Sequence, residues 1–308
     1  MTLHRSTPGL SLLVAVLFSG CASLPEIGPF VDASAQLRAG VASSGDAVAA
    51  EVRRIEGGDK LADQLSAEWA ARVQMCDALV RYADSLQAIT EAGREGRQTA
   101  QSLADSVTAL ATAAKIALPG AQAVGVVTDT AKFIYQQIAL ARAANSLENS
   151  LTAVAPAVDE VATQIARDLK SLEKILVVAT DTSKNRLITS NSSMLGFRNQ
   201  VNKTRESAYA KLSKTPPANL AKELEDVNKL VDATKSLNDA YEKEIAEITK
   251  RRNSAGALIR ASSDAINQWA AAHRQLVAAV KDRRPVNPQS LVDATRELRD
   301  LIKRMREL

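Results

Sequence analysis

The sequence predicts an all-α protein, an elongated bundle of long antiparallel and partly coiled-coil helices. Aromatic residues make up only 3% of the 308 residues, and an interior of alanine and leucine suits helices packed closely side by side. The glycines and prolines lie in clusters separated by long stretches without either. This distribution argues against a β-sandwich, which needs a turn signal every 8–12 residues or so. No self-similar period of roughly 30–45 residues indicates a repeat protein.

The N-terminal residues 1–21 predict the destination of the chain, and they read MTLHRSTPGLSLLVAVLFSGC. A polar segment with one firm positive charge, Arg5, precedes an apolar run from Leu10 to Phe18 that is too short to span a bilayer. Such a run is typical of an export signal peptide, here residues 1–20. The ending LFSGC resembles the lipobox of bacterial lipoproteins. The resemblance implies cleavage before Cys21 and acylation of its thiol and its new amino group.

The lipoprotein resemblance covers residues 1–21 alone, and one position departs from the family pattern. Phe18 stands where a leucine is usual, three residues before the cysteine. An ordinary secretory signal followed by an unmodified cysteine is the alternative. Ala22 replaces the aspartate that retains lipoproteins at the inner membrane, so the family rule implies the outer membrane. Several acyl chains on Cys21 would give stable anchoring, because each buried CH₂ adds roughly 0.8 kcal/mol.

Residues 21–31 are predicted to form a short tether between the lipid anchor and the helical body. They contain Pro25, Gly28 and Pro29. Each proline lacks an amide donor and restricts the residue before it, so a regular helix is not expected in this segment.

The body, residues 32–284, is predicted to start with two helices. Asp32 is a suitable N-cap for a helix to about Glu56, where Gly57 and Gly58 end it. A second helix begins at Asp59 and is expected to end before the helix-breaking residues Pro119 and Gly120. Its length would be up to about 85 Å. Its apolar residues are spaced three or four positions apart, as expected for one face of a helix. They are Leu61, Leu65, Trp69, Val73, Cys76, Val80, Ala83 and Leu86.

The middle of the chain predicts further helical stretches. One runs from 121 to about 180, with a kink expected at Pro156. The short break at Pro119 and Gly120 favours an antiparallel hairpin with the preceding helix. The polar stretch 180–193 is either a loop or a frayed helix. Another helical piece, 194–214, ends before Pro216 and Pro217.

Residues 218–283 carry a heptad repeat without a slip, which favours a supercoil against a partner helix. One seam position falls on Leu220, Val227, Thr234, Tyr241, Ile248, Ala255, Ser262, Trp269 and Leu276. The other falls on Leu224, Val231, Asn238, Ile245, Arg252, Ile259, Ile266, His273 and Val280. The polar members Asn238, Arg252 and His273 would specify register and partner at some cost in stability. Asn287 and Pro288 begin a basic C-terminal helix within residues 285–308.

Few residues suit catalysis or metal binding. After removal of the signal peptide, the chain keeps one histidine, His273, and one unmodified cysteine, Cys76. A structural zinc site needs four nitrogen or sulfur ligands, and a triad needs a base beside its nucleophile. We therefore expect His273 to be packed or hydrogen-bonded between helices and Cys76 to be an inert core thiol. An intermolecular disulfide through Cys76 is the alternative in an oxidising periplasm.

The charge pattern points to a solvated surface and not to a nucleic-acid partner. The formal charge is +4, with 35 acidic residues mixed among the basic ones, whereas nucleic-acid binding usually needs a basic stripe. The many carboxylates also lack a cleft-forming fold, so a glycosidase-type pair is not expected. We predict no enzyme activity, no cofactor, no metal and no small-molecule substrate.

Residues 106–128 stand apart because they carry a single charge, Lys115, and reverse at Pro119 and Gly120. Each leg is too short to span a membrane as one helix. The apolar tip loosely resembles the membrane-inserting head of α-helical pore-forming toxins, although fold analogy does not establish function. The alternative is a tip that other helices bury or that packs on a partner.

The sequence thus predicts a non-enzymatic outer-membrane lipoprotein that acts as a helical scaffold or protein-interaction module. Its partners would be the bilayer, through acylated Cys21, and a protein or a second copy, through the helix seams. The second hypothesis is a membrane-perturbing protein of the pore-forming type that acts through residues 106–128.

Overall fold

The protein is all-helical in the part of the chain that the computed structural model describes. The structure describes residues 27–92, 105–106, 147–211, 217–282 and 289–307. Seven helices and no strand occur there: α1 (Gly28–Arg53), α2 (Asp59–Ala92), α5 (Leu147–Ser190), α6 (Ser192–Lys211), α7 (Pro217–Ala233), α8 (Lys235–Asp282) and α9 (Gln289–Arg306). The predicted all-α class is therefore confirmed.

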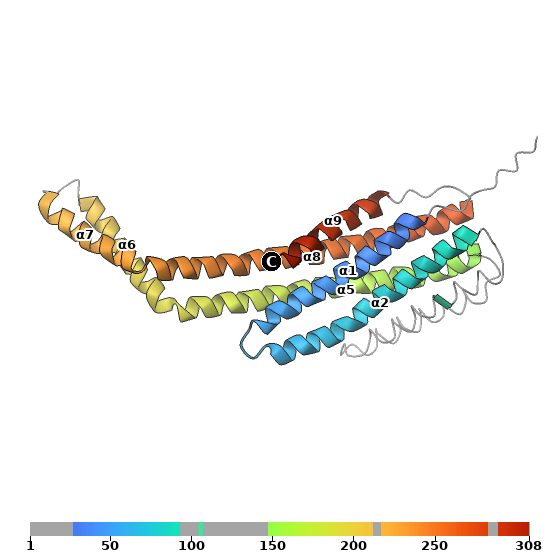
Figure 1. Cartoon of the computed structure of the whole chain (residues 1–308), viewed down its shortest axis with the longest axis horizontal. Helices are drawn as coiled ribbons and strands as arrows, with labels where there is room; N and C mark the ends of the chain where they lie inside the picture. Colours follow the sequence, from blue (N-terminus) through green and yellow to red (C-terminus); the bar gives the residue numbers. More distant parts are fainter. Residues whose placement is uncertain (1–26, 93–104, 107–146, 212–216, 283–288, 308) are drawn as a thin grey trace, which may run out of the picture.

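The helices form an elongated bundle from which a two-helix extension projects (Figure 1). Helix α1 lies in the middle of the bundle and contacts α2, α5, α8 and α9. Helices α5 and α8 pair with each other and continue beyond the end of α1. Helices α6 and α7 then pack on each other and form the projecting part, which we call the arm. The start of α1 lies at the end of the bundle opposite the arm.

Helix α1 begins at Gly28, four residues before the expected N-cap at Asp32. Pro29 lies in the first turn, where an amide donor is not needed and the fixed φ of proline suits the helix. Ile27 and Phe30 are both 5% exposed, so burial in the core holds this first turn in place. The expectation of a non-helical tether is wrong for residues 28–31.

The turn between α1 and α2 follows the prediction. Helix α1 ends at Arg53, close to the expected Glu56, and α2 begins at Asp59 as expected. Gly57 has a φ of +74°, a conformation that side chains with a Cβ rarely adopt. Helix α2 is described to Ala92. The further course of the second helix predicted for 59–117 lies outside the described residues, apart from residues 105–106.

Helix α5 covers most of the third predicted stretch and continues through Pro156. The loop alternative for residues 180–193 is wrong, because α5 runs to Ser190 and α6 starts at Ser192. The hydroxyl groups of this polar stretch donate to carbonyls of the preceding turn, as Thr182 does to Val178 at 2.8 Å. Such bonds satisfy the side chains without interrupting the helix.

The long helix expected over 218–283 is divided into α7 and α8 at Thr234. The amide of Thr234 donates to the carbonyls of both Leu230 and Val231, each at 3.3 Å, and its hydroxyl contacts the same two carbonyls at 3.1 Å. The side chain thus competes for the carbonyls that a regular helix would use. The predicted heptad seam is nevertheless correct, because none of its eighteen residues is exposed.

Close contact between α1 and α2 depends on one glycine. A Cβ at Gly45 would lie 2.0 Å from Cδ1 of Trp69. The indole of Trp69 lies against this bare backbone, and its Nε1 donates to the carbonyl of Val41 at 2.8 Å. Glycine at position 45 therefore lets a large side chain of α2 enter the interface and reach a main-chain acceptor of α1.

Candidate functional site

The strongest functional residue from the sequence, Cys21, lies outside the described residues. So do residues 107–128 of the apolar segment, with Lys115, Pro119 and Gly120. Ser106, at the start of that segment, is described as helical, and its hydroxyl is hydrogen-bonded to the hydroxyl of Ser85 on α2. Acylation at Cys21 and membrane insertion by residues 106–128 both stay predictions.

The predicted core position of Cys76 is confirmed. Cys76 is 1% exposed, and burial, followed by the nearby charge of Asp77, raises its pKa to about 12. Because the thiolate is the reactive form, this thiol is a poor nucleophile at neutral pH. Its burial also leaves no accessible sulfur for the intermolecular disulfide that we considered as the alternative.

His273 belongs to a cluster of ring side chains that joins α1, α2 and α8. This aromatic cluster consists of Phe30, Tyr82, Trp269 and His273. The Tyr82 hydroxyl and Nε2 of His273 are 2.7 Å apart. The rings of Phe30 and Trp269 stack with centroids 4.7 Å apart, and those of Trp269 and His273 are 5.9 Å apart. The predicted interhelical hydrogen bond of His273 is thus confirmed, with α2 as the partner helix.

The aromatic cluster keeps its titratable groups neutral at physiological pH. Burial lowers the pKa of His273 to about 3, with a smaller contribution from the positive charge of Arg274. Burial also raises the pKa of Tyr82 above its usual range. Nδ1 of His273 is buried and has no hydrogen-bond partner, so the ring is only partly satisfied. The cluster thus lacks a base with a pKa near neutrality.

Of the other polar seam residues, one contacts another helix and one does not. Arg252 of α8 donates to Asp181 of α5 at 2.6 Å, so its partner lies within this chain. Asn238 bonds only within its own helix, to Glu242 at 2.6 Å. His273 and Arg252 therefore both bond to other helices of this molecule, whereas the side chain of Asn238 does not.

Sequence reasoning missed a buried carboxylate at the end of the bundle. One oxygen of Glu51 accepts hydrogen bonds from Arg54 at 2.7 Å and from Arg251 at 2.9 Å, while its other oxygen is buried without a partner. The side chain of Glu51 is only 4% exposed. Arg251 is 200 positions away in sequence, and no local pattern indicates such a pairing.

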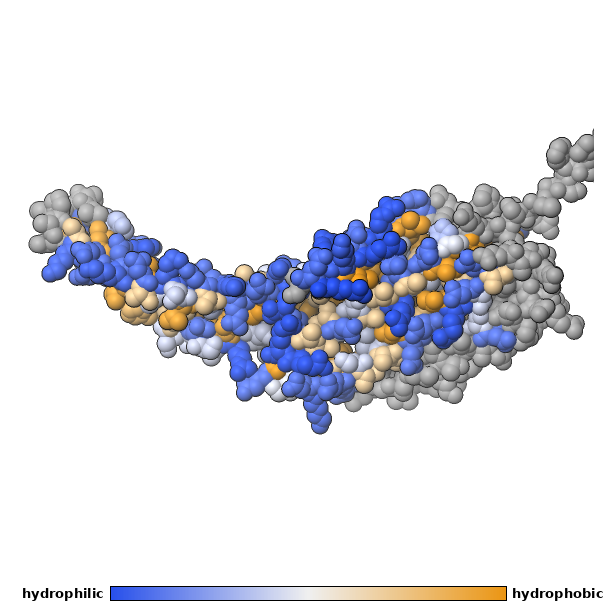
Figure 2. All heavy atoms as spheres, in the orientation of Figure 1, coloured by the Kyte–Doolittle hydropathy of each residue, from blue (hydrophilic) through white to orange (hydrophobic). Residues whose placement is uncertain are grey.

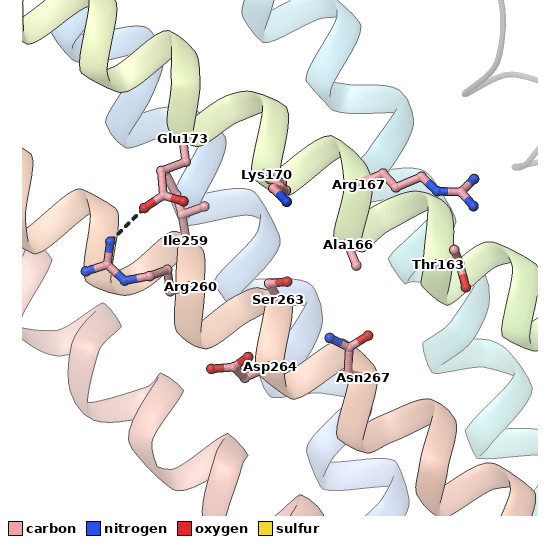
Figure 3. Close-up of a pocket in the computed structure, with 10 residues that line it drawn as sticks. All are labelled: Thr163, Ala166, Arg167, Lys170, Glu173, Ile259, Arg260, Ser263, Asp264 and Asn267. Carbon is pink, nitrogen blue, oxygen red and sulfur yellow. Dashed lines mark hydrogen bonds and ion pairs between the residues drawn. The ribbon is translucent and has the colours of Figure 1, made fainter.

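A polar groove of about 440 Å³ lies between α5 and α8. Figure 3 shows Arg260 and Glu173 facing each other at one end, where they form an ion pair of 2.6 Å. Arg167 points away from the groove at the other end. The groove presents charges of both signs, namely those of Lys170, Glu173, Arg260 and Asp264, and its lining contains no histidine or cysteine.

A second groove, of about 390 Å³, is mainly apolar and lies where α2 meets α5. It is lined by Val52, Leu61, Gln64, Leu65, Glu68, Lys174, Ile175 and Val178. Leu61 is 58% exposed and Val178 is 65% exposed. Sequence reasoning placed Leu61 and Leu65 on an apolar stripe, but the exposure of Leu61 could not be read from periodicity alone.

The arm and the ends of α5 and α8 next to it carry the other exposed large apolar side chains of the described residues. They are Ile188 on α5, Phe197 and Tyr209 on α6, Leu230 on α7 and Leu237 on α8. Figure 2 shows a mostly hydrophilic arm with hydrophobic residues gathered along its lower edge. Five of the eight exposed large apolar side chains that the structure describes therefore lie on the arm or beside its base.

The chain matches no protein-family model, no curated protein and no solved structure. Within the described ranges, no group of three or more His, Cys, Asp or Glu residues could hold a metal ion. Among the helices described, none is both long enough and apolar enough to cross a membrane.

Proposed function

We propose that this chain is a non-enzymatic lipoprotein of the bacterial outer membrane that acts as a scaffold. Acyl chains on Cys21 hold it to the lipid surface, and the helical body presents the arm to another envelope component. The proposal rests on the sequence of residues 1–21 for the anchor and on the exposed side chains of the arm for the contact.

The observation that carries the contact role is the exposure of apolar residues on the arm. Phe197 is 44% exposed, Tyr209 is 54% exposed and Leu230 is 45% exposed. Phe197 and Tyr209 are both on α6, and aromatic side chains are enriched in protein-protein interfaces relative to the rest of the surface. The arm also lies at the opposite end of the molecule from the start of α1 (Figure 1). An anchor that precedes α1 would leave the arm free to reach a partner.

Site-specific photo-cross-linking in cells tests the contact role. We expect a photoreactive residue at Phe197 or Tyr209 to give a discrete adduct with an envelope protein. The matched control is Arg167 on α5, whose side chain is 62% exposed and which should give no adduct. Adducts at Arg167 with none at Phe197 or Tyr209 would place the contact surface elsewhere.

Replacement of the cysteine tests the anchor. Cys21→Ser should release the protein from the membrane fraction and abolish acyl labelling, because serine has no thiol to acylate. Fractionation and metabolic labelling measure both effects. A variant that still carries labelled acyl chains would contradict the lipobox interpretation.

Vesicle leakage separates the scaffold from the pore-forming hypothesis. We expect the Cys21→Ser protein to leave dye-loaded vesicles intact, because a scaffold has no need to breach the bilayer. Dye release that is lost on Val124→Asp would favour membrane insertion through residues 106–128.

A further inference from the structure

The arm has a thin interior and an exposed side. Between α6 and α7 the buried apolar residues that the structure describes are Val201, Ala208, Leu220 and Val227. Two helices of this length gain little stability from so small a core, because helix stability in proteins comes mainly from packing an apolar face. Packing against further helices is the usual solution.

Two rows of exposed residues run along one side of the arm. On α6 the row is Phe197, Gln200, Thr204, Ser207 and Lys211, all exposed. On α7 and the first turn of α8 it is Glu223, Asp226, Leu230, Ala233 and Leu237, also all exposed. Steps of three and four residues keep each row on one side of its helix.

Both rows lie on the same side of the arm. Each is displaced from the buried positions of its helix by roughly a quarter turn, in the same rotational sense. Helices α6 and α7 are antiparallel neighbours, and Arg198 of α6 donates to Thr234 at 3.1 Å. In an antiparallel pair, equal displacements bring both rows to one side. Phe197, Leu230 and Leu237 then lie towards the base of the arm, and Lys211 and Glu223 lie towards its tip.

The two helices of the arm carry opposite net charge. Helix α6 has four basic residues and one acidic residue. Helix α7 has two basic residues and four acidic ones. On the shared side itself, Lys211 is the charged residue of the α6 row, and Glu223 and Asp226 are the charged residues of the α7 row. A surface with one basic and one acidic edge is complementary to itself after a two-fold rotation, because the rotation lays each edge against the opposite one.

We propose that the arm pairs with the arm of a second copy of this chain, with α6 of each protomer against α7 of the other. The two-fold axis runs along the arm, so that Phe197 meets the leucines at the base and Lys211 meets the carboxylates near the tip. The result is a four-helix bundle with both tips at the same end. This inference deepens the proposed function, because it rests on the arm as a contact surface and names the partner.

The size of the face agrees with a reversible dimer. Helix α6 has 20 residues, which gives it a length of about 30 Å at 1.5 Å per residue. Two helices side by side, each about 10 Å wide, present about 600 Å² per protomer. Both protomers together would bury about 1,200 Å², at the lower end of the range for stable interfaces.

Charge reversal and recombination test the arrangement. One variant carries Lys211→Glu, which makes the α6 row acidic. The other carries Glu223→Lys and Asp226→Lys, which makes the α7 row basic. All three side chains are exposed, so the fold should be preserved, and circular dichroism checks this. The body control, Lys170→Glu with Lys174→Glu, reverses two exposed lysines of α5.

Sedimentation equilibrium of the full chain in a density-matched detergent gives the readout. We expect the wild type and the body control to approach twice the monomer mass as concentration rises. Each arm variant alone should stay monomeric, because like charges face each other. An equimolar mixture of the two arm variants should recover the dimer, since both contacts become attractive again.

Three results would overturn the proposal. They are a wild type that stays monomeric, arm variants that dimerise like the wild type, and a mixture that does not recover the dimer. A monomeric wild type whose Phe197 or Tyr209 still cross-links to a different envelope protein would leave the scaffold function intact. The two proposals can therefore fail separately.

Discussion

At the scale of single residues, the bundle depends on a few polar and small side chains at helix crossings. The indole of Trp269 donates to the hydroxyl of Ser34 at 2.7 Å, and the hydroxyls of Ser44 and Ser262 are 3.2 Å apart. Both contacts link α1 to α8. A buried hydrogen bond between helices is directional, so these pairs fix the register that alanine packing alone would leave less defined.

His273 should make stability depend on pH in the acid range. The pKa of His273 is about 3 in the folded state and 6.5 in the unfolded state. Between these two pH values the imidazole is protonated in the unfolded chain and neutral in the folded one. Stability is then complete above pH 6.5 and falls between pH 6.5 and about 3, by about 1.4 kcal/mol per pH unit. Denaturant unfolding at several pH values measures this. In the double variant Tyr82→Phe with His273→Leu, the free energy of unfolding should depend less on pH. An unchanged pH dependence would contradict the assignment to His273.

Two glycines in helices should respond oppositely to alanine. Gly45→Ala places a Cβ against the Trp69 ring and should destabilise the protein by about 1–3 kcal/mol through overpacking. At Gly196 no atom lies within 4 Å of the added Cβ, so Gly196→Ala should stabilise α6 by about 0.5–1 kcal/mol. Thermal unfolding compares the two variants. Equal effects would mean that Trp69 does not lie against Gly45.

At the scale of elements, sequence periodicity predicted the buried faces better than the ends of the helices. The heptad over 218–283 found the inward side of α7 and α8 because burial recurs with the helical period. It did not predict the break at Thr234, which depends on one hydroxyl, or the early start of α1, which depends on burial of Phe30 beside Trp269. Those two causes involve a particular side-chain bond and a residue far along the chain.

The seam of α8 should carry stability while its outward positions do not. Ile266 is 0% exposed, so Ile266→Ala should cost about 2–5 kcal/mol through lost contacts and a residual cavity. Glu247 is exposed and lies off the seam, so Glu247→Ala should change the free energy of unfolding by less than about 0.5 kcal/mol. Urea titration followed by circular dichroism measures both. Equal losses at the two positions would mean that the register of α8 is misplaced.

At the scale of the whole molecule, the candidate site was only partly accessible to sequence reasoning. The export signal and Cys21 form one contiguous motif, so they could be recognised without a fold. The arm could not, because local periodicity does not show which helices pack around a given helix. The heptad seam did place Val227 inward, and it left Leu230 and Leu237 outside the seam, where they are exposed. Whether another helix covers such outward residues depends on where the neighbouring helices lie.

The elongated shape gives the last prediction, which small-angle scattering can check on residues 32–308. Helix α8 has 48 residues and is therefore about 72 Å long at 1.5 Å per residue. A globular chain of this size would have a radius of gyration of roughly 19 Å. Because α5 and α8 run side by side and the arm extends them further (Figure 1), we expect a clearly larger radius and an asymmetric distance distribution. A measured radius near the globular value would mean that the arm folds back onto the bundle, and it would remove the exposed face on which arm pairing depends.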